Sequence, residues 1–296
     1  MRASAILGLG CSAEDPKAFQ ANGAVEWRMG MPAGSDQVDV ILLFGGDGTV
    51  HRHLGPLVRL GLPVLVVPAG SGNDFARALG LRRVRDSLAA WQKFCGGAGS
   101  VRTIDLGMIS AAGHAGRYFC CVAGVGLDGE VSRRANQLPR WLRGNGGYAL
   151  TLIPTILGFA PLPMKILKAA EGVPEGSGQS TVNPGWTVIS DQPTTLAAFA
   201  NTPVYGGGMK IAPQAKMDDG LLDICVVGGL DTFQLFCKFP TVYSGNHLKI
   251  REVDYSQARR VRVETEHPLD VYADGEYICQ TPVEVSIQPA ALKVVI

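Results

Sequence analysis

The chain has 296 residues, of which 46% are hydrophobic and 18% charged, and its formal net charge is +1. This composition excludes an intrinsically disordered chain, and the near-zero net charge gives no reason to expect nucleic acid as a partner. At about 150 residues per domain, the length predicts two domains. The seven cysteines form no C-x-x-C pair, which favours a reducing compartment over a disulfide framework or a zinc ribbon.

The first apolar run predicts a β-strand over residues 4–9, because it is short for a leader peptide and acidic residues follow it. Residues 144–164 carry no charge and approach the length of about 20 apolar residues that spans a membrane. Three prolines interrupt this stretch. We therefore expect one helix over 148–157, followed by a turn and a strand, rather than a membrane span.

Strand and helix signals alternate in the first third of the chain. Apolar runs at 39–44 and 62–67 predict strands that end in glycine or proline. Helices are expected after them, over 49–60 and over 75–79. Because both strands are apolar throughout, they indicate a parallel sheet that is covered on both faces.

The pattern changes near residue 110, where short strand-like runs separated by glycine, proline and Asp-Gly turns predict an antiparallel sandwich or barrel. These runs are 118–122, 186–189, 197–200, 222–227, 261–264, 269–272, 283–287 and 292–296. Residues 173–184 predict an exposed loop. We therefore expect a nucleotide-binding α/β domain over 1–109 and a β-rich domain over 110–296, with the last few residues free to return to the first domain.

Two glycine-rich turns follow the neighbouring strands of the expected parallel sheet. Residues 45–49 read Gly-Gly-Asp-Gly-Thr, and residues 70–74 read Gly-Ser-Gly-Asn-Asp. Glycines let the backbone approach a polyphosphate, and a helix N-terminus offers it free N–H groups. Either loop alone would equally be a plain connection. Because the carboxyl ends of parallel strands meet at one crevice, the pair predicts a nucleotide site.

The aspartate of the first loop, Asp47, cannot itself attract phosphate. It would hold magnesium, orient the loop or position an attacking hydroxyl. A third segment, residues 124–129, matches G-x-G-x-x-G, but a dinucleotide site needs an acidic residue about 20 positions later. Residues 131–170 contain no Asp or Glu, so we interpret the segment as a glycine-rich turn.

The same acid-free stretch is basic. Its cations are Arg133, Arg134, Arg140, Arg143, Lys165 and Lys168, and Trp141 lies among the arginines. Such a patch would suit an anionic membrane surface. A solvated helix face whose arginines bind acids from elsewhere explains the pattern equally well.

A set of motifs stands in order along nearly the whole chain: GGDGT (45–49), PAGSGNDFARALG (68–80), IDLG (104–107), GVGLDGEV (124–131), FANTPVYGGGMKIAPQAKMDDGLLDI (199–224) and DGEYICQTPVEVSIQP (274–289). The first motif alone also resembles loops of NAD kinases and phosphofructokinases. The ordered set resembles the diacylglycerol kinase catalytic family, specifically its soluble bacterial lipid kinases. The resemblance implies a nucleotide domain like that of NAD kinase, a β-rich lipid domain, and chemistry in the cleft between them.

The resemblance also implies roles for individual residues. ATP would contact the two glycine-rich loops and the start of the helix after the first: Gly45, Gly46, Asp47, Gly48, Thr49, Val50, His51, Arg52, Gly70, Ser71, Gly72 and Asn73. Asp47, Asp74 and Asp105 would form an acidic network around phosphate and catalytic Mg²⁺. Glu276 would accept a proton, with Asp274 beside it.

A second, structural Mg²⁺ is implied at Asp219 and at backbone carbonyls near Lys216 and Leu221. Without the resemblance, residues 218–220 are an ordinary turn signal. The Asp-Gly pair at 274–275 would likewise be a plain hairpin turn, for which it is the strongest short signal.

The chain departs from the family after GGDGT, where Val-Asn-Glu is usual and Val50-His51-Arg52 stands here. We expect His51 and His53 to occupy exposed helix positions rather than to bind a metal. The family's opening N-P-x-S-G segment is missing. Because only 20 residues follow Glu276, an element that packs back on the first domain would be short or absent.

The resemblance implies an ATP- and Mg²⁺-dependent lipid kinase of phospholipid metabolism that phosphorylates a lipid hydroxyl, such as that of diacylglycerol. The enzyme would be cytoplasmic and peripherally bound to a membrane surface, and an exposed sheet edge leaves room for a homodimer. Two alternatives stay open. One is a lipid-binding pseudokinase, because the usual residues after GGDGT are replaced; the other is an NAD kinase-like enzyme.

Overall fold

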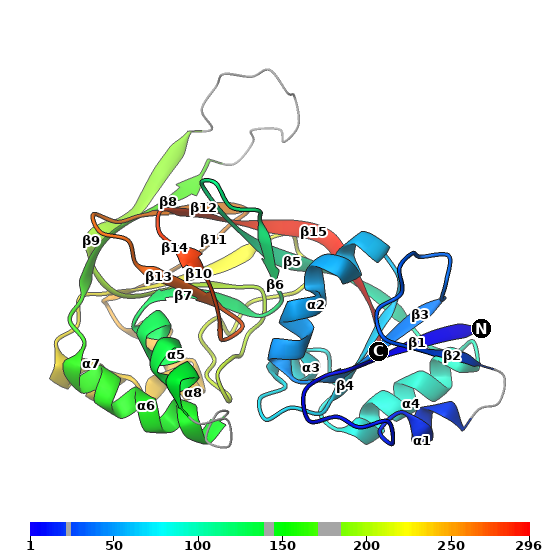
Figure 1. Ribbon diagram of the computed structural model, residues 1–296. Helices are drawn as coiled ribbons and strands as arrows, with labels where there is room; N and C mark the ends of the chain where they lie inside the picture. Colours follow the sequence, from blue (N-terminus) through cyan, green and yellow to red (C-terminus); the bar gives the residue numbers. More distant parts are fainter. Residues whose placement is uncertain (22–24, 139–144, 171–184) are drawn as a thin grey trace.

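The apolar runs of the first third form a parallel sheet in the strand order β2–β1–β3–β4. Its strands are β1 (Arg2–Leu7), β2 (Glu26–Met29), β3 (Val40–Gly45) and β4 (Val64–Pro68). The computed structural model, shown in Figure 1, describes residues 1–21, 25–138, 145–170 and 185–296. The loop expected at 173–184 lies outside the described residues, as do Arg140, Trp141 and Arg143.

Helices cover both faces of this sheet, as the wholly buried strands β3 and β4 require. The helix α2 (Asp47–Leu60) packs on one face, and α1 (Lys17–Gln20) and α4 (Val84–Cys95) pack together on the other. The short α3 (Asp74–Ala78) follows β4. These elements confirm the expected strand and helix alternation.

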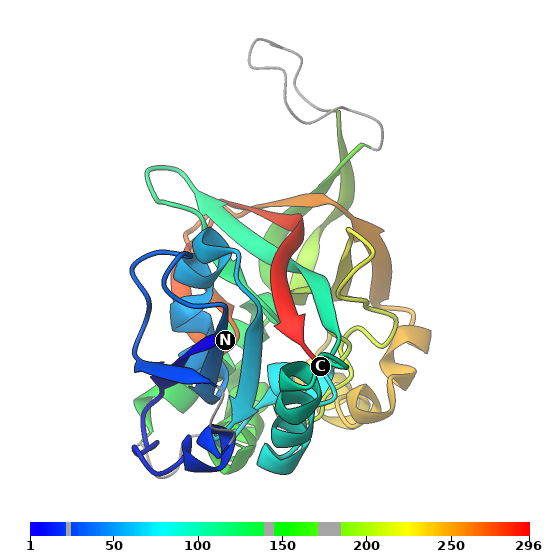
Figure 2. The same cartoon turned by 90° about the vertical axis from the view of Figure 1, so that its right-hand side faces the viewer.

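Two long strands connect the parallel sheet to the second half. The strands β5 (Val101–Ala111) and β15 (Val283–Val295) pair antiparallel, and the end of β15 runs parallel to β4. Figure 2 shows β15, in red, beside β5 as it reaches the first sheet. The returning element is therefore short but present. The domain boundary between residues 109 and 110 stays a prediction.

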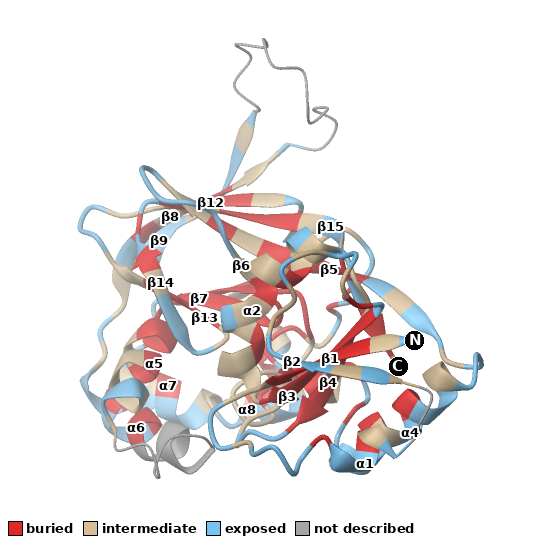
Figure 3. Ribbon diagram, turned by 45° about the vertical axis from the view of Figure 1, so that its right-hand side comes forward, coloured by how far each residue is buried: buried red, intermediate tan, exposed pale blue. Residues whose placement is uncertain are grey.

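The second half is an antiparallel sandwich whose two sheets share β9 (Trp186–Ala200). The first part of β9 pairs with β8 (Leu162–Ala169), and its second part pairs with β7 (Val122–Gly126) and β10 (Leu222–Gly228). The remaining strands are β6 (Arg117–Phe119), β11 (Val253–Ala258), β12 (Arg260–Glu264), β13 (Asp270–Ala273) and β14 (Glu276–Gln280). Buried residues, shown in red in Figure 3, are concentrated in the strands of both halves.

The prediction of separate strands at 186–189 and 197–200 was wrong, because both belong to β9. The strands expected at 283–287 and 292–296 are likewise both part of β15. Its register shifts between Gln288 and Leu292, where Ala290 has φ 53°. In the sequence, such an irregularity looks like the end of one strand and the start of another, although the strand continues through it.

Helices cover the outer face of the sandwich sheet that contains β7 (Figure 1). They are α5 (Leu127–Gln137), α6 (Asn145–Gly158), α7 (Thr232–Lys238), α8 (Thr241–Ser244) and the 3₁₀ turn η2 (Asn246–Lys249). The helix expected at 148–157 is thus confirmed as α6. Among the described residues, no helix combines the length and the apolar character needed to cross a bilayer.

The described cations of the basic stretch lie on two elements. Arg133 and Arg134 lie on α5, and both bind the carboxylate of Glu130, at 2.7 Å. Lys165 and Lys168 lie on strand β8. The acid that the two described arginines bind is therefore on their own helix rather than in a distant segment, and contact of this stretch with a membrane stays a prediction.

Candidate active site

The two glycine-rich loops leave adjacent strands and contact each other. Ala69 N–H donates to the carbonyl of Gly45 at 3.1 Å. Within the second loop, the Asn73 side chain accepts from Gly70 N–H at 2.9 Å and donates to its carbonyl at 2.6 Å. Asn73 has a positive φ of 57°, a conformation that asparagine tolerates. These hydrogen bonds hold the two loops against each other.

Asp47 joins the two loops through its carboxylate. One oxygen accepts from Asp74 N–H at 3.0 Å and the other from Phe75 N–H at 3.1 Å. These are N–H groups at the start of α3, so Asp47 caps that helix from the neighbouring loop. Burial, with a smaller contribution from the nearby Asp74 charge, raises the pKa of Asp47 to about 6. Of the roles considered from the sequence, orienting the loops is the one seen.

Asp74 offers a carboxylate oxygen with no hydrogen-bond partner. Its Oδ1 is buried and lies 3.1 Å from Arg77 Nη1 without hydrogen-bond geometry, while Oδ2 accepts from Gly207 N–H at 3.4 Å. Burial also raises the pKa of Asp74. A divalent cation prefers carboxylate oxygens and would offset the cost of two neighbouring buried acids. The donor set of Asp47 and Asp74 therefore fits Mg²⁺.

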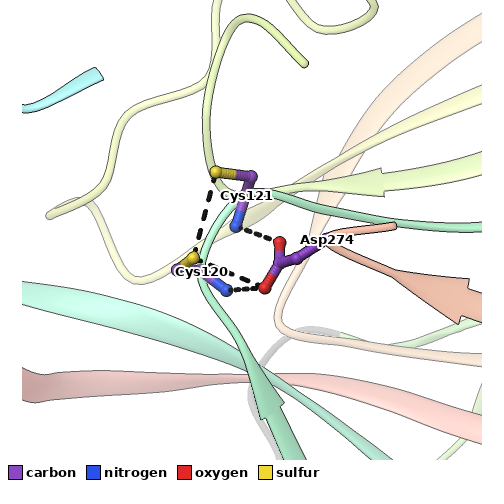
Figure 4. Close-up of side chains that lie close together, drawn as sticks. All are labelled: Cys120, Cys121 and Asp274. Atoms are coloured by element: carbon purple, nitrogen blue, oxygen red, sulfur yellow. Dashed lines mark hydrogen bonds between the residues drawn. The ribbon is translucent and has the colours of Figure 1, made fainter. Parts of the chain in front are cut away.

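The Asp-Gly pair forms the expected turn between β13 and β14. Asp274 has φ 51° and Gly275 has φ 81°, the positive values that such hairpin turns need. The Asp274 carboxylate accepts from the N–H groups of Cys120 and Cys121 at 2.9 and 2.8 Å (Figure 4). Burial would raise the pKa of Asp274, but hydrogen bonds from His51 and these peptides hold it below its ordinary value.

The two thiols of Figure 4 lie near Asp274 without the chemistry of a metal site. Cys120 and Cys121 place their sulfur atoms 3.9 Å apart. Burial raises the pKa of the Cys120 thiol well above its ordinary value. A protonated thiol is a poor metal ligand.

Glu276 begins β14 and reaches across to the first glycine-rich loop. A Cβ atom placed on Gly48 would lie 2.8 Å from Glu276 Oε1. Glu276 and the two loops line one cavity of about 350 Å³. The residues predicted from the sequence that line it are Gly46, Asp47, Gly48, Thr49, Arg52, Gly70, Ser71, Gly72, Asp74, Asp274 and Glu276.

Asp105 does not join this cluster. It is 4% exposed, and its two carboxylate oxygens accept from Gly220 N–H and Ala290 N–H, each at 2.8 Å. It thus ties the 218–220 turn to β15. Asp219 and Lys216 are exposed, and Asp219 accepts from Leu221 N–H of its own turn at 3.1 Å. A magnesium site at this turn stays a prediction.

The expectation of exposed helix positions was wrong for both histidines. The His51 side chain is 10% exposed, and its Nδ1 lies 3.1 Å from Asp274 Oδ2. His53 is half-buried, with Nδ1 2.8 Å from the Thr49 carbonyl of its own helix. Val50 is buried, and Gly45 ends β3. None of these four lines the cavity described above.

The opposite wall of the cavity comes from residues that the sequence did not single out. Tyr205 donates from its hydroxyl to Asp128 at 2.9 Å, and Asn136 donates to the carbonyl of Gly275 at 2.9 Å. Tyr272 also lines this wall. Tyr205 and Asp128 belong to two of the motifs quoted above, and that membership could have identified them as candidate site residues. No local sequence pattern marks Asn136 or Tyr272 as a cavity residue.

Two family models match the chain in succession. Residues 21–109 match the diacylglycerol kinase catalytic domain, and residues 121–296 match the YegS C-terminal NAD kinase beta sandwich-like domain. A protein of Mycobacterium tuberculosis named diacylglycerol kinase is 36% identical over 256 residues, which is 86% of this chain and 76% of the relative. A probable YegS-like lipid kinase of Chromohalobacter salexigens is 26% identical over 278 residues, covering 90% and 78%.

Solved structures show the same fold at lower identity. A putative diacylglycerol kinase from Bacillus anthracis matches with a TM-score of 0.73 at 20% identity, over 99% of this chain and 94% of that one. An NAD kinase from Archaeoglobus fulgidus in complex with ATP matches with a TM-score of 0.53 at 14% identity, over 100% and 92%. The family models and the mycobacterial relative together show that the chain belongs to the diacylglycerol kinase-like family of lipid kinases.

Proposed function

We propose that the protein transfers the γ-phosphoryl group of ATP to the hydroxyl of a lipid such as diacylglycerol, with Mg²⁺ as cofactor. The observation that carries the proposal is the contact between Glu276 and Gly48. It brings a carboxylate from the C-terminal hairpin to the N-terminus of α2, where backbone N–H groups favour phosphate. The proposed base, Glu276, and the proposed phosphate loop, residues 46–49, thus line one cavity.

Each group of cavity residues would have a separate role in the reaction. The 46–49 and 70–72 loops bind the ATP phosphates through backbone N–H groups. Glu276 accepts the hydroxyl proton as the lipid oxygen bonds to the γ-phosphorus, and the bond from that phosphorus to the departing ADP oxygen breaks. Asp47 and Asp74 would hold Mg²⁺, which neutralises phosphate charge when bound. Loops that already contact each other lower the cost of orienting the nucleotide.

The lipid would be reached at a membrane surface. Several large apolar side chains on α6, α7 and α8 are about half exposed or more: Ile153, Leu157, Phe233, Phe236 and Tyr243. Beneath these helices lies a narrow apolar cavity of about 60 Å³, lined by Leu235, Phe239 and Val242. Tyr205 lines both this cavity and the catalytic one. An acyl chain entering between these helices would bring its headgroup toward Glu276.

A cytoplasmic location would supply ATP, and it agrees with the seven free cysteines, all of which lie in the described part of the chain. The strand β2 forms an open edge of the parallel sheet. A homodimer through this edge stays a prediction that analytical ultracentrifugation would test.

The decisive experiment measures transfer of labelled γ-phosphate from Mg²⁺-ATP to a panel of lipid alcohols in mixed micelles, with soluble NAD as a further acceptor. Glu276→Gln should abolish most of the transfer, and Glu266→Gln, at an exposed position, is the matched control. Transfer to NAD alone would indicate an NAD kinase-like enzyme. Lipid binding without any transfer from folded protein would indicate a pseudokinase.

A further inference from the structure

His51 connects the two halves of the molecule at the turn that carries Glu276. It lies one helical turn after Gly48 on α2, so both side-chain positions face the β13–β14 hairpin. Gly48 packs against Glu276, and His51 Nδ1 lies 3.1 Å from Asp274 Oδ2, across 223 residues of sequence. The first turns of α2 therefore contact the hairpin at two points.

Asp274 is held in place mainly by the second half. Its carboxylate accepts the N–H groups of Cys120 and Cys121, and its own N–H donates to the carbonyl of Val122 at 3.0 Å. The Cys120 thiol lies 3.4 Å from Oδ2 (Figure 4). These contacts keep the turn folded without His51. What His51 adds is the attachment of that turn to the nucleotide half.

The chemistry of the pair fixes the direction of the hydrogen bond. An ionised carboxylate can only accept, so Nδ1 of His51 carries the proton and donates. Charge-assisted bonds of this kind are stronger than neutral ones. With the His51 side chain 10% exposed and that of Asp274 fully buried, water competes weakly for the contact.

We propose that His51 is a positioning residue that acts through Asp274 to hold Glu276 against the 46–49 loop. An asparagine at this position would place its amide nitrogen about where Nδ1 of the imidazole stands, and that nitrogen would also be a donor. This inference rests on the proposed kinase activity for its kinetic consequence, but not for its structural one.

The test compares His51→Phe, which keeps a ring without the donor, with His51→Asn, which keeps a donor. His53→Ala is the matched control, because His53 bonds within its own helix. We expect His51→Phe to lower kcat by about tenfold to a hundredfold, as for a misplaced reacting group. KM for ATP should stay near wild type, while the melting temperature should fall, because a buried charge-assisted hydrogen bond is lost. His51→Asn should recover at least a third of the lost rate, and His53→Ala should change it less than twofold.

A second measurement does not depend on activity. Hydrogen–deuterium exchange of residues 275–278 should be faster in His51→Phe than in wild type, with exchange of β10 and β11, which do not pair with this hairpin, unchanged. If wild type transfers no phosphate but this exchange difference is seen, the proposed function fails and the positioning role stands. Unchanged exchange in His51→Phe would overturn the inference. So would a phenylalanine variant with wild-type kcat, or a loss that His51→Asn fails to rescue.

Discussion

Gly46 and Gly70 lie backbone against backbone where the two phosphate-loop candidates meet. A Cβ atom on Gly46 would be 2.9 Å from the Cα of Gly70, a distance that side chains essentially never adopt. The absence of side chains thus lets the loops that follow β3 and β4 pack directly against each other. Glycine is required at both positions for this approach rather than for a turn.

Replacing either glycine should separate the loops. Gly70→Ala is expected to lower the free energy of unfolding by about 1–3 kcal/mol, as overpacking commonly does, and to weaken ATP binding further. Urea denaturation and nucleotide titration measure the two effects. Gly55→Ala is the matched control, because a Cβ atom there meets open space. In mid-helix it should stabilise by about 0.5–1 kcal/mol. Equal stability of the two variants would refute the close-packing argument.

Gly48→Ala should reduce activity without unfolding the protein. The new Cβ would meet only the flexible end of the Glu276 side chain, which can rotate away, so the melting temperature should not fall. If Glu276 is the proton acceptor, as proposed above, displacing it should slow phosphate transfer by about tenfold to a hundredfold. A variant with wild-type kcat would show that the position of Glu276 against this loop does not matter for catalysis.

His247 gives a pH dependence of stability outside the active site. The residue is 5% exposed, Nε2 lies 3.1 Å from the Ile211 carbonyl, and Nδ1 has no hydrogen-bond partner. Burial lowers its pKa below the usual value of about 6.5. The unfolded chain therefore binds a proton first as the pH falls, so His247 destabilises the fold progressively below about pH 6.5.

Urea denaturation of wild type and His247→Gln at pH 7.5 and pH 5.5 would measure this effect. Glutamine keeps a donor for the Ile211 carbonyl but does not titrate. Acidification should cost the wild type more free energy of unfolding than the variant. An identical loss in both proteins would contradict a lowered pKa at His247.

The exposed apolar side chains of α7 can be tested separately from catalysis. Phe233 and Phe236 are 76% and 51% exposed, so Phe233→Ser/Phe236→Ser should leave the melting temperature nearly unchanged. Each lost ring removes up to about 2–3 kcal/mol of apolar burial in a bilayer. Sedimentation with phosphatidylglycerol vesicles should show at least tenfold weaker binding. Val188→Ser, at an exposed position on β9, is the control, and equal binding of both variants would exclude this face.

Local signals in the sequence predicted much of the fold. The apolar runs of β3 and β4, the glycine-rich loops after them and the Asp-Gly hairpin at 274–275 were all assigned from short segments. Each depends on side-chain periodicity or turn chemistry within about ten residues, which does not change when distant parts dock. Strand continuity was the exception. The register shift near Ala290 and the passage of β9 between two sheets both depend on neighbouring strands.

For the candidate site, too, some features follow from local sequence and others depend on tertiary contacts. By itself the sequence determined which residues form the two glycine-rich loops and which hairpin carries Glu276, because each is a contiguous motif. Only the tertiary structure decided that Asp105 binds the 218–220 turn and that His51 binds Asp274. Those contacts form when the two halves pack together. From the sequence, a histidine on an amphipathic helix is expected to be exposed. The hairpin that buries His51 lies more than 200 residues later in the chain, so no local signal predicts the contact.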